Sequence, residues 1–326
     1  MIELAFGRDW VRRRERAGAV IWPGTDARRV LQLILAGIWL LDGMLQYQPS
    51  MYTTMFGQMI GGTAAGNPGV VARPIMWDAA LVGDHLVLLN SVFAAVQLLL
   101  GLGIAYRRTV RVALAASIAW SLGVWWFGEG LGGVLSGSAS TVSGAPGAVI
   151  VYALLAVLLW PAERPCVAAP FAAARAVGAP AARLLWLVLW SSLAYFALTP
   201  ANRAPQALHD MMVGLTGGEP GWVTWLENHA AAVLAGQGLT ASVVLAAALI
   251  VVAAAVFLPP PLARCALILA LVVAAFIWVF GEAFGQLLTG GATDPNSGPL
   301  LALAYWPAAM AAGQAVATGR PEQEPA

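Results

Sequence analysis

The 326-residue chain has no lysine, two cysteines and three histidines, and only 10% of its residues are charged. An average soluble domain has about 25% charged residues, so this composition excludes an ordinary soluble protein. The cysteines, Cys166 and Cys265, share no CxxC or zinc-type spacing, and we expect both to face the cytoplasm, where disulfides are rare. The net charge of +1 gives no indication of a nucleic-acid partner.

Catalytic motifs are also missing. The sequence contains no nucleotide-binding loop, no Ser/His/Asp hydrolase pattern, no metalloprotease zinc motif and no flavin fingerprint. It also lacks a soluble domain that could carry such a site. We therefore do not expect the chain to be an enzyme on its own, although it could be a subunit of a membrane oxidoreductase.

Apolar residues are abundant. Hydrophobic residues make up 60% of the chain and the mean hydropathy is +0.76. Runs of about 20 apolar residues are typical of transmembrane helices, because the lipid core is about 30 Å thick. The sequence therefore predicts an all-α, polytopic protein of the inner (cytoplasmic) cell membrane, embedded in the lipid bilayer. We expect eight spans, at about 28–47, 79–105, 109–132, 145–161, 182–199, 230–258, 262–287 and 298–316.

The chain also repeats itself. Phe127-Gly128-Glu129 returns 153 residues later as Phe280-Gly281-Glu282, with a tryptophan before each. Further matches are Gly132 with Gly285, Leu135 with Leu288, Gly137 with Gly290, Ala139 with Ala292, Pro146 with Pro299, Asn67-Pro68-Gly69 with Glu219-Pro220-Gly221, and Arg29 with Arg183. A near-constant offset predicts an internal duplication, and an even number of spans makes the two copies parallel. We predict a basic N-terminal segment (1–27), a first four-helix repeat (28–161), a linker (162–181), a second repeat (182–316) and a tail (317–326).

The arginines predict the orientation, because positive residues favour the cytoplasmic side of a membrane. With the N-terminus inside, only Arg73 and Arg203 lie in outer segments, and the other fifteen arginines lie on the cytoplasmic side. Both termini and the linker are then cytoplasmic, and the long loops are on the outer side. Each long loop contains a short amphipathic piece, expected to lie in the outer interface as a helix.

The architecture resembles that of the DoxX-like membrane family, with four helices per unit and an arginine-bearing turn before the third. The local match is the run Val96-Gln97-Leu98-Leu99-Leu100-Gly101-Leu102-Gly103, then Tyr106-Arg107-Arg108. Family members usually have an acidic residue just before this run, whereas this region has Asn90 and Gln97. The resemblance implies association with membrane redox chemistry, such as quinone-linked oxidation or thiol stress systems, as a subunit beside a catalytic partner.

The duplicated Glu129 and Glu282 are the first candidate site residues. A carboxylate near the lipid core is costly, so both copies retain it for a reason. One interpretation is a paired site for protons, a cation or a polar substrate. The other is structural, with each glutamate hydrogen-bonding backbone groups of the glycine-rich loop that follows.

Other polar residues occur in one copy only. Asp42 lies within the first predicted span, and its counterpart is the apolar Phe196. Asp84, His85 and His229 lie near outer helix entrances. Together with Asp78 they could form a proton-labile or metal-binding cluster, or simply make interfacial hydrogen bonds.

Three methionines, Met51, Met55 and Met59, recur every four residues in the first outer loop. Thioethers select Cu(I), so the stripe could bind copper, but methionine is also an adaptable packing residue. Our leading expectation is a non-catalytic anchor or quinone-side subunit of a membrane redox complex. The alternatives are a transporter or channel for a small ion or solute, including copper, with a path at the repeat interface, and a purely structural subunit of a larger assembly.

Overall fold

The structure is a computed structural model that describes residues 27–161 and 172–304. The predicted N-terminal segment up to residue 26, Cys166, residues 305–316 of the last predicted span and the tail 317–326 lie outside these ranges. Within the described residues every regular element is a helix and there is no strand. The all-α prediction is therefore confirmed for this part of the chain.

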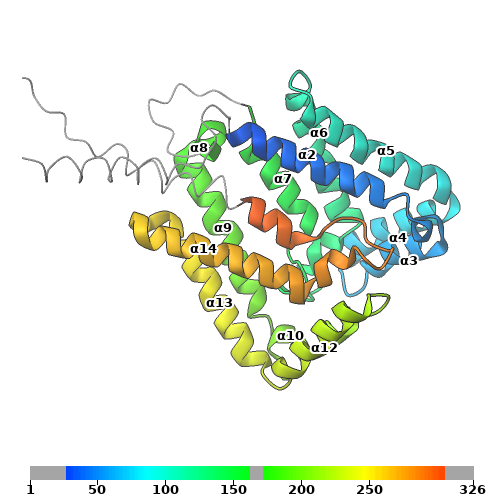
Figure 1. Ribbon diagram of the computed structural model, residues 1–326. Coiled ribbons are helices and arrows are strands. Elements are labelled where there is room, and N and C mark those ends of the chain that lie inside the picture. The colour runs from blue at the N-terminus through cyan, green and yellow to red at the C-terminus, as the bar shows by residue number, and fades with distance from the viewer. Residues whose placement is uncertain (1–26, 162–171, 305–326) are drawn as a thin grey trace, which may run out of the picture.

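The helices are joined by short turns, apart from longer loops before α7 and before residue 297 (Figure 1). The first part of the chain contains α2 (Ala27–Leu45), η1 (Pro49–Tyr52), α3 (Thr54–Gly62), α4 (Gly69–Asp84), α5 (Leu86–Ala105), α6 (Val110–Phe127), η2 (Gly130–Gly133) and α7 (Ala148–Leu158). The second part contains α8 (Ala172–Val177), α9 (Ala179–Ala197), α10 (Pro200–Arg203), α11 (Ala207–Gly214), α12 (Gly221–Leu234), α13 (Gly238–Ala254), η3 (Ala255–Phe257), α14 (Pro260–Phe276), η4 (Ile277–Gly281), η5 (Ala283–Gln286) and a helical segment at 297–304.

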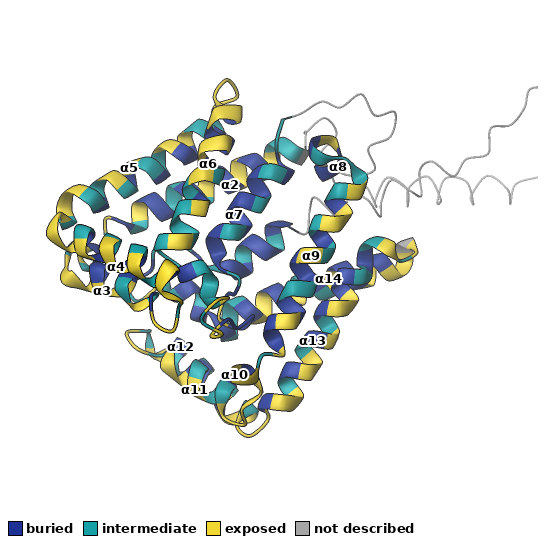
Figure 2. Ribbon diagram, turned by 180° about the vertical axis from the view of Figure 1, so that it is seen from behind, coloured by how far each residue is buried: buried dark blue, intermediate teal, exposed yellow. Residues whose placement is uncertain are grey.

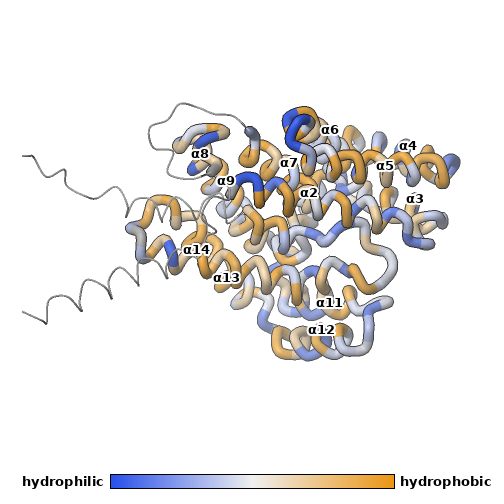
Figure 3. Tube along the Cα trace, turned by 45° about the horizontal axis from the view of Figure 1, so that its top comes forward, coloured by the Kyte–Doolittle hydropathy of each residue, from blue (hydrophilic) through white to orange (hydrophobic). Residues whose placement is uncertain are grey.

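Within the described residues, five helices are long and apolar enough to cross a membrane. They are Leu86–Ala105, Val110–Phe127, Ala179–Ala197, Gly238–Phe257 and Pro261–Gly281. These helices expose large apolar side chains; Leu99 is 67% exposed, Val112 74% and Val244 64%. Figure 2 shows exposed residues along the helices, and Figure 3 shows that the same helices are largely hydrophobic. Exposed apolar surface on helices of this length faces lipid, so the chain is a multi-pass membrane protein.

Two of the predicted spans start later than expected. α5 begins at Leu86 because His85 leaves the helical conformation and separates it from α4. α13 begins at Gly238 because Gly236 takes a left-handed φ of 76°, which ends α12. α14 is followed directly by a π-helical turn, Ile277–Gly281, in place of further regular α-helix.

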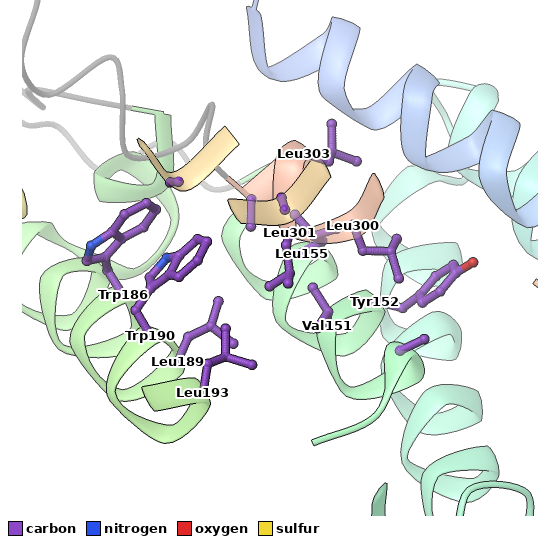
Figure 4. Packing of buried hydrophobic residues seen from close by; sticks show 14 of the residues in the cluster. Val151, Tyr152, Leu155, Trp186, Leu189, Trp190, Leu193, Leu300, Leu301 and Leu303 are labelled. Carbon is purple, nitrogen blue, oxygen red and sulfur yellow. The ribbon is translucent and has the colours of Figure 1, made fainter. Parts of the chain in front are cut away.

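One continuous hydrophobic core joins the two parts of the chain. α2 packs along α5 and α9 along α13, while α7 lies against α6. Figure 4 shows Trp186 and Trp190 of α9 and Tyr152 and Leu155 of α7 in this core, near Leu301 of the segment 297–304. The two parts therefore fold against each other as one unit.

Two loops reinforce this junction. In the loop before α7, the hydroxyl of Thr141 donates a hydrogen bond to the carbonyl of Leu193 in α9. In the loop before residue 297, the carbonyl of Ala292 accepts a hydrogen bond of 2.8 Å from the side-chain amide of Gln48. Each part thus sends a loop into the other, and the second loop reaches the cavity described next.

Candidate functional site

A cavity of about 280 Å³ lies among α2, α3, α4, α5 and α6, at the end where the long loops gather. Four residues with carboxyl groups line it, namely Asp42, Asp78, Glu129 and Asp294. Among the described residues, no arginine or histidine lines this cavity. Its remaining wall is mainly apolar and aromatic, so the acidic groups face a confined space without a nearby positive side chain.

Asp42 belongs to the buried face of α2 and is only 2% exposed. Its Oδ2 accepts a hydrogen bond of 2.6 Å from the hydroxyl of Tyr152 in α7. Its Oδ1 has no hydrogen-bond partner among the described residues. The ring of Trp39, one turn earlier, packs on Tyr152 with ring centroids 4.5 Å apart. The sequence identified Asp42, but not the tyrosine that positions it.

Several neighbouring polar groups also lack hydrogen-bond partners. The side-chain oxygens of Gln46 and Gln97 and the indole N–H of Trp120 are buried, and in the described part of the chain none of them has a hydrogen-bond partner. All three residues line the cavity. A buried polar group without a partner costs about 1–3 kcal/mol, so a cluster of them is unusual in a packed core.

Glu129 lies two residues after the end of α6, and its side chain contacts the start of the next helix, α7. Its Oε1 accepts a 3.2 Å hydrogen bond from the backbone N–H of Val149, in the first turn of α7. Its Oε2 has no partner among the described residues. Burial, reinforced by the charge of Asp294, raises the pKa of Glu129 to about 8. The left-handed φ of Leu131 and Gly132, 57° and 62°, turns the chain sharply after it.

Glu282 occupies a closely similar local arrangement, but both of its oxygens have partners. Oε1 accepts hydrogen bonds from the backbone N–H and the hydroxyl of Ser297, and Oε2 accepts one of 3.0 Å from the N–H of Gly298. Burial raises the pKa of Glu282 to about 7, although these hydrogen bonds oppose the shift. Each glutamate therefore caps the helix that follows its loop, and Glu129 alone retains a free oxygen.

The tryptophans before these glutamates give a correction to the sequence alignment. The indole N–H of Trp125 donates to the carbonyl of Pro146, 21 residues later, while that of Trp278 donates to Pro295, 17 residues later. The second loop is therefore shorter between equivalent contacts. Pro295, and not Pro299 as the constant offset predicted, makes the contact that corresponds to Pro146.

Asp294 is an acidic residue of this cavity that lies in a loop and was not among the candidate site residues. Its Oδ1 accepts a 2.7 Å hydrogen bond from the N–H of Asn296, and its Oδ2 accepts one of 2.8 Å from the hydroxyl of Thr293. Its removal from bulk water raises its pKa. The sequence does not indicate which cavity a turn residue lines, because its position depends on how the two parts of the chain pack together.

A second cavity, of about 330 Å³, lies beside the first and is mainly polar. It is built by the loop before α7 and contains Ser138, Ser140 and Ser143. Gly128 and Glu129 line both cavities. Glu129 therefore stands between a polar space under the loops and the acidic cavity deeper in the bundle.

The other predicted acidic and histidine residues lie elsewhere. Asp84 and His85 are exposed at the break between α4 and α5, and His229 is exposed with its Nδ1 2.7 Å from the carbonyl of Trp225. Across 27–161 and 172–304, no group of three or more His, Cys, Asp or Glu side chains is placed to hold a metal ion. Only Asp78 of the predicted cluster lines the acidic cavity.

The methionine stripe is interrupted. Met51 lies fully buried in η1, whereas Met55 and Met59 belong to α3 and are 44% and 40% exposed. Thr53 caps α3 between them, so the three side chains do not share one helix. Copper binding by this stripe stays a prediction.

A further buried carboxyl group belongs to Glu227 in α12, the helix that also carries His229. Glu227 is fully buried, and neither of its oxygens has a partner in the described residues. Burial, followed by the nearby charge of Glu219, raises its pKa to about 7. One sequence signal is that Glu227 follows the buried Ile75 by 152 residues, the same offset that separates Pro68 from Pro220, and a charge in place of an apolar core residue is rare.

No family model matches the chain, and comparison with curated proteins and with solved structures also gives no match. The resemblance to the DoxX-like family therefore stays a prediction. What the site can do chemically follows from its own groups, which can exchange protons or neutralise a positive charge.

Proposed function

We propose that the chain is a transporter or channel subunit that binds a small cation or a proton in the acidic cavity. One observation carries this proposal: four carboxyl-bearing residues line a cavity that no described basic side chain enters. A site of this composition attracts positive charge and repels anions.

The energetics of burial support exchange at this site. An ionised carboxylate in a medium of low polarity costs several kcal/mol or more unless it is paired, so it takes up a proton or a cation. The free oxygens of Asp42 and Glu129 are the groups that would do so. Acids that face the interior of a membrane-protein helix bundle typically mark ion or substrate pathways.

The second cavity supplies an approach from the loops. Its serine hydroxyls can exchange hydrogen bonds with water or a solute, and Glu129 separates it from the acidic cavity. We propose that solute passes Glu129 to reach Asp42. The arginine distribution predicts that this opening faces away from the cytoplasm, with both termini inside the cell.

The proposal includes eight spans built as two parallel repeats. The capping glutamates, the paired tryptophan–proline contacts and the left-handed turns at Gly132 and Gly285 support it. The polar side chains Asp42, Gln97 and Trp120 correspond by offset to Phe196, Leu249 and Val273. Because the second copy uses apolar residues at these positions, packing does not require the polar ones.

The expectation of an anchor or quinone-side subunit of a redox complex stays a prediction. Purification in mild detergent tests it, because a stoichiometric partner that carries a cofactor would favour that function. A homogeneous single species would favour the cation-binding function proposed above.

The proposed function is tested with purified protein in liposomes that contain a pH-sensitive dye or a cation indicator. We expect Asp42→Asn and Glu129→Gln to lose most of the flux, while Asp210→Asn on the exposed face of α11 keeps it. Binding of cations to the same variants in detergent is the companion measurement. The proposal fails if neither flux nor cation binding depends on Asp42.

A further inference from the structure

The acidic cavity also indicates which kind of cation it binds. A bare metal ion needs several oxygen ligands converging on one point. Among the described residues, no three His, Cys, Asp or Glu side chains converge in that way, so a metal ion here would also need the amide oxygens of Gln46 or Gln97 or backbone carbonyls. The space of about 280 Å³ is instead close to the lower end of small-molecule sites, which span about 300–1,000 Å³.

Aromatic rings form much of the wall. Phe93 contacts Phe56 and Trp120 edge-on, with ring centroids 6.3 Å and 5.6 Å apart. Trp39 and Phe127 also line the cavity. A wall of rings favours a cation that has an apolar body, because the ring faces attract positive charge and the body is removed from water.

The unpartnered atoms define the polar end of the ligand. The carboxyl oxygens of Asp42 and Glu129 and the side-chain oxygens of Gln46 and Gln97 are acceptors without donors in the described structure. Four acceptors call for a ligand that donates several hydrogen bonds. An ammonium group with N–H donors does this, whereas a quaternary ammonium cannot.

We infer that the cavity binds a small primary organic ammonium ion, with its N–H groups among these acceptors and its apolar body on the aromatic wall. This inference rests on the proposed function and narrows its substrate class. Trp120 contributes its ring and Asp42 the opposing charge.

Three matched compounds test the inference by calorimetry on the full chain in detergent. They are 2-phenylethylammonium, its N,N,N-trimethyl analogue, which has the same charge but no N–H, and neutral 2-phenylethanol. We expect saturable binding of the primary ammonium, at least about tenfold tighter than that of either analogue, since tenfold corresponds to about 1.4 kcal/mol. Sodium chloride at matched ionic strength should not displace it.

Variants distinguish binding in the cavity from non-specific partition of the compounds into detergent. Asp42→Asn and Gln97→Leu should weaken binding at least about tenfold, and Asp210→Asn should leave it unchanged; Gln97→Leu serves if Asp42→Asn does not fold. Trp120→Phe keeps a ring and should retain most binding, whereas Trp120→Leu should lose it.

Equal binding of all three compounds, or displacement by sodium, would overturn the inference. The proposed function would survive that result if Asp42-dependent flux of protons or inorganic cations persisted. Loss of every Asp42-dependent binding and flux signal would reject both.

Discussion

The hydroxyl of Tyr152 donates a 2.6 Å hydrogen bond to Asp42, and this contact ties α7 to α2 at the wall of the acidic cavity. Both side chains are almost completely buried. Tyr152 occupies only one of the two carboxyl oxygens, and the other has no hydrogen-bond partner among the described residues. The pair therefore leaves one unpaired acceptor on a residue that lines the cavity.

Tyr152→Phe should lower the free energy of unfolding by about 1–3 kcal/mol, because a buried carboxyl group loses its donor. The measurement is equilibrium unfolding in mixed micelles. The double variant Asp42→Leu/Tyr152→Phe removes both partners and should be less destabilised than the sum of the single variants. Strict additivity would show that the hydrogen bond does not contribute.

The two capping glutamates should respond differently to glutamine. At Glu282 the new amide group must face a backbone N–H of Ser297 or Gly298, so Glu282→Gln should cost about 1–3 kcal/mol. Glu129→Gln can keep its oxygen on Val149 and should cost about 1 kcal/mol or less. Unfolding of both variants side by side makes the comparison, and equal losses would contradict it.

The stability of the protein should fall as pH rises above the ordinary carboxyl value. Glu129 has its pKa raised from 4.5 to about 8, so in this window the folded state holds a proton that the unfolded state has released. Glu282, raised from 4.5 to about 7, adds a loss of the same sign up to that pH. Thermal unfolding between pH 5 and about 9 tests the direction, and Glu129→Gln should flatten the curve above about pH 7.

The sequence predicted the class of the fold and part of the site. Hydrophobic runs located the helices because burial in lipid leaves a strong compositional signal, but they did not reveal the breaks at His85 and Gly236, which depend on local backbone conformation. Asp42 and Glu129 were found because an acid among apolar residues is rare.

The rest of the site depends on tertiary packing. Asp294 reaches the cavity only because its loop crosses to the other part of the chain, as the bond from Gln48 to Ala292 shows. Tyr152 lies in an otherwise apolar helix, and nothing in the sequence indicates that its hydroxyl group contacts Asp42. The complete burial of Glu227 follows from the packing of α12 and not from its neighbours in the sequence.

The orientation of the protein in the membrane is predicted from arginine alone and can be measured in intact cells. In a cysteine-free background, Ser138→Cys should react with an impermeant maleimide, while Arg107→Cys should react only after the cells are opened. Arg107 is exposed in the turn between α5 and α6, so lack of access would not reflect burial. The reverse labelling pattern would place the acidic cavity on the cytoplasmic side.

Gly147 controls how Glu129 sits between the two cavities. Its φ is 117°, and a Cβ atom added there would lie 2.0 Å from Oε2 of Glu129 and 3.0 Å from the ring of Trp125. Gly147→Ala should therefore displace the free carboxyl oxygen and reduce cation binding and flux at least about tenfold, besides lowering stability.

Gly137→Ala is the matched control for this substitution. Gly137 also has a left-handed φ, of 77°, but no atom lies within 4 Å of an added Cβ. It should show only the cost of backbone strain, about 1 kcal/mol, and retain binding and flux. If the two alanine variants lose function equally, strain in the loop explains the loss. If only Gly147→Ala does, the cause lies at Gly147 itself, where the new methyl group meets Oε2 of Glu129 and the ring of Trp125 and where the backbone, at φ 117° and ψ 143°, suits glycine alone.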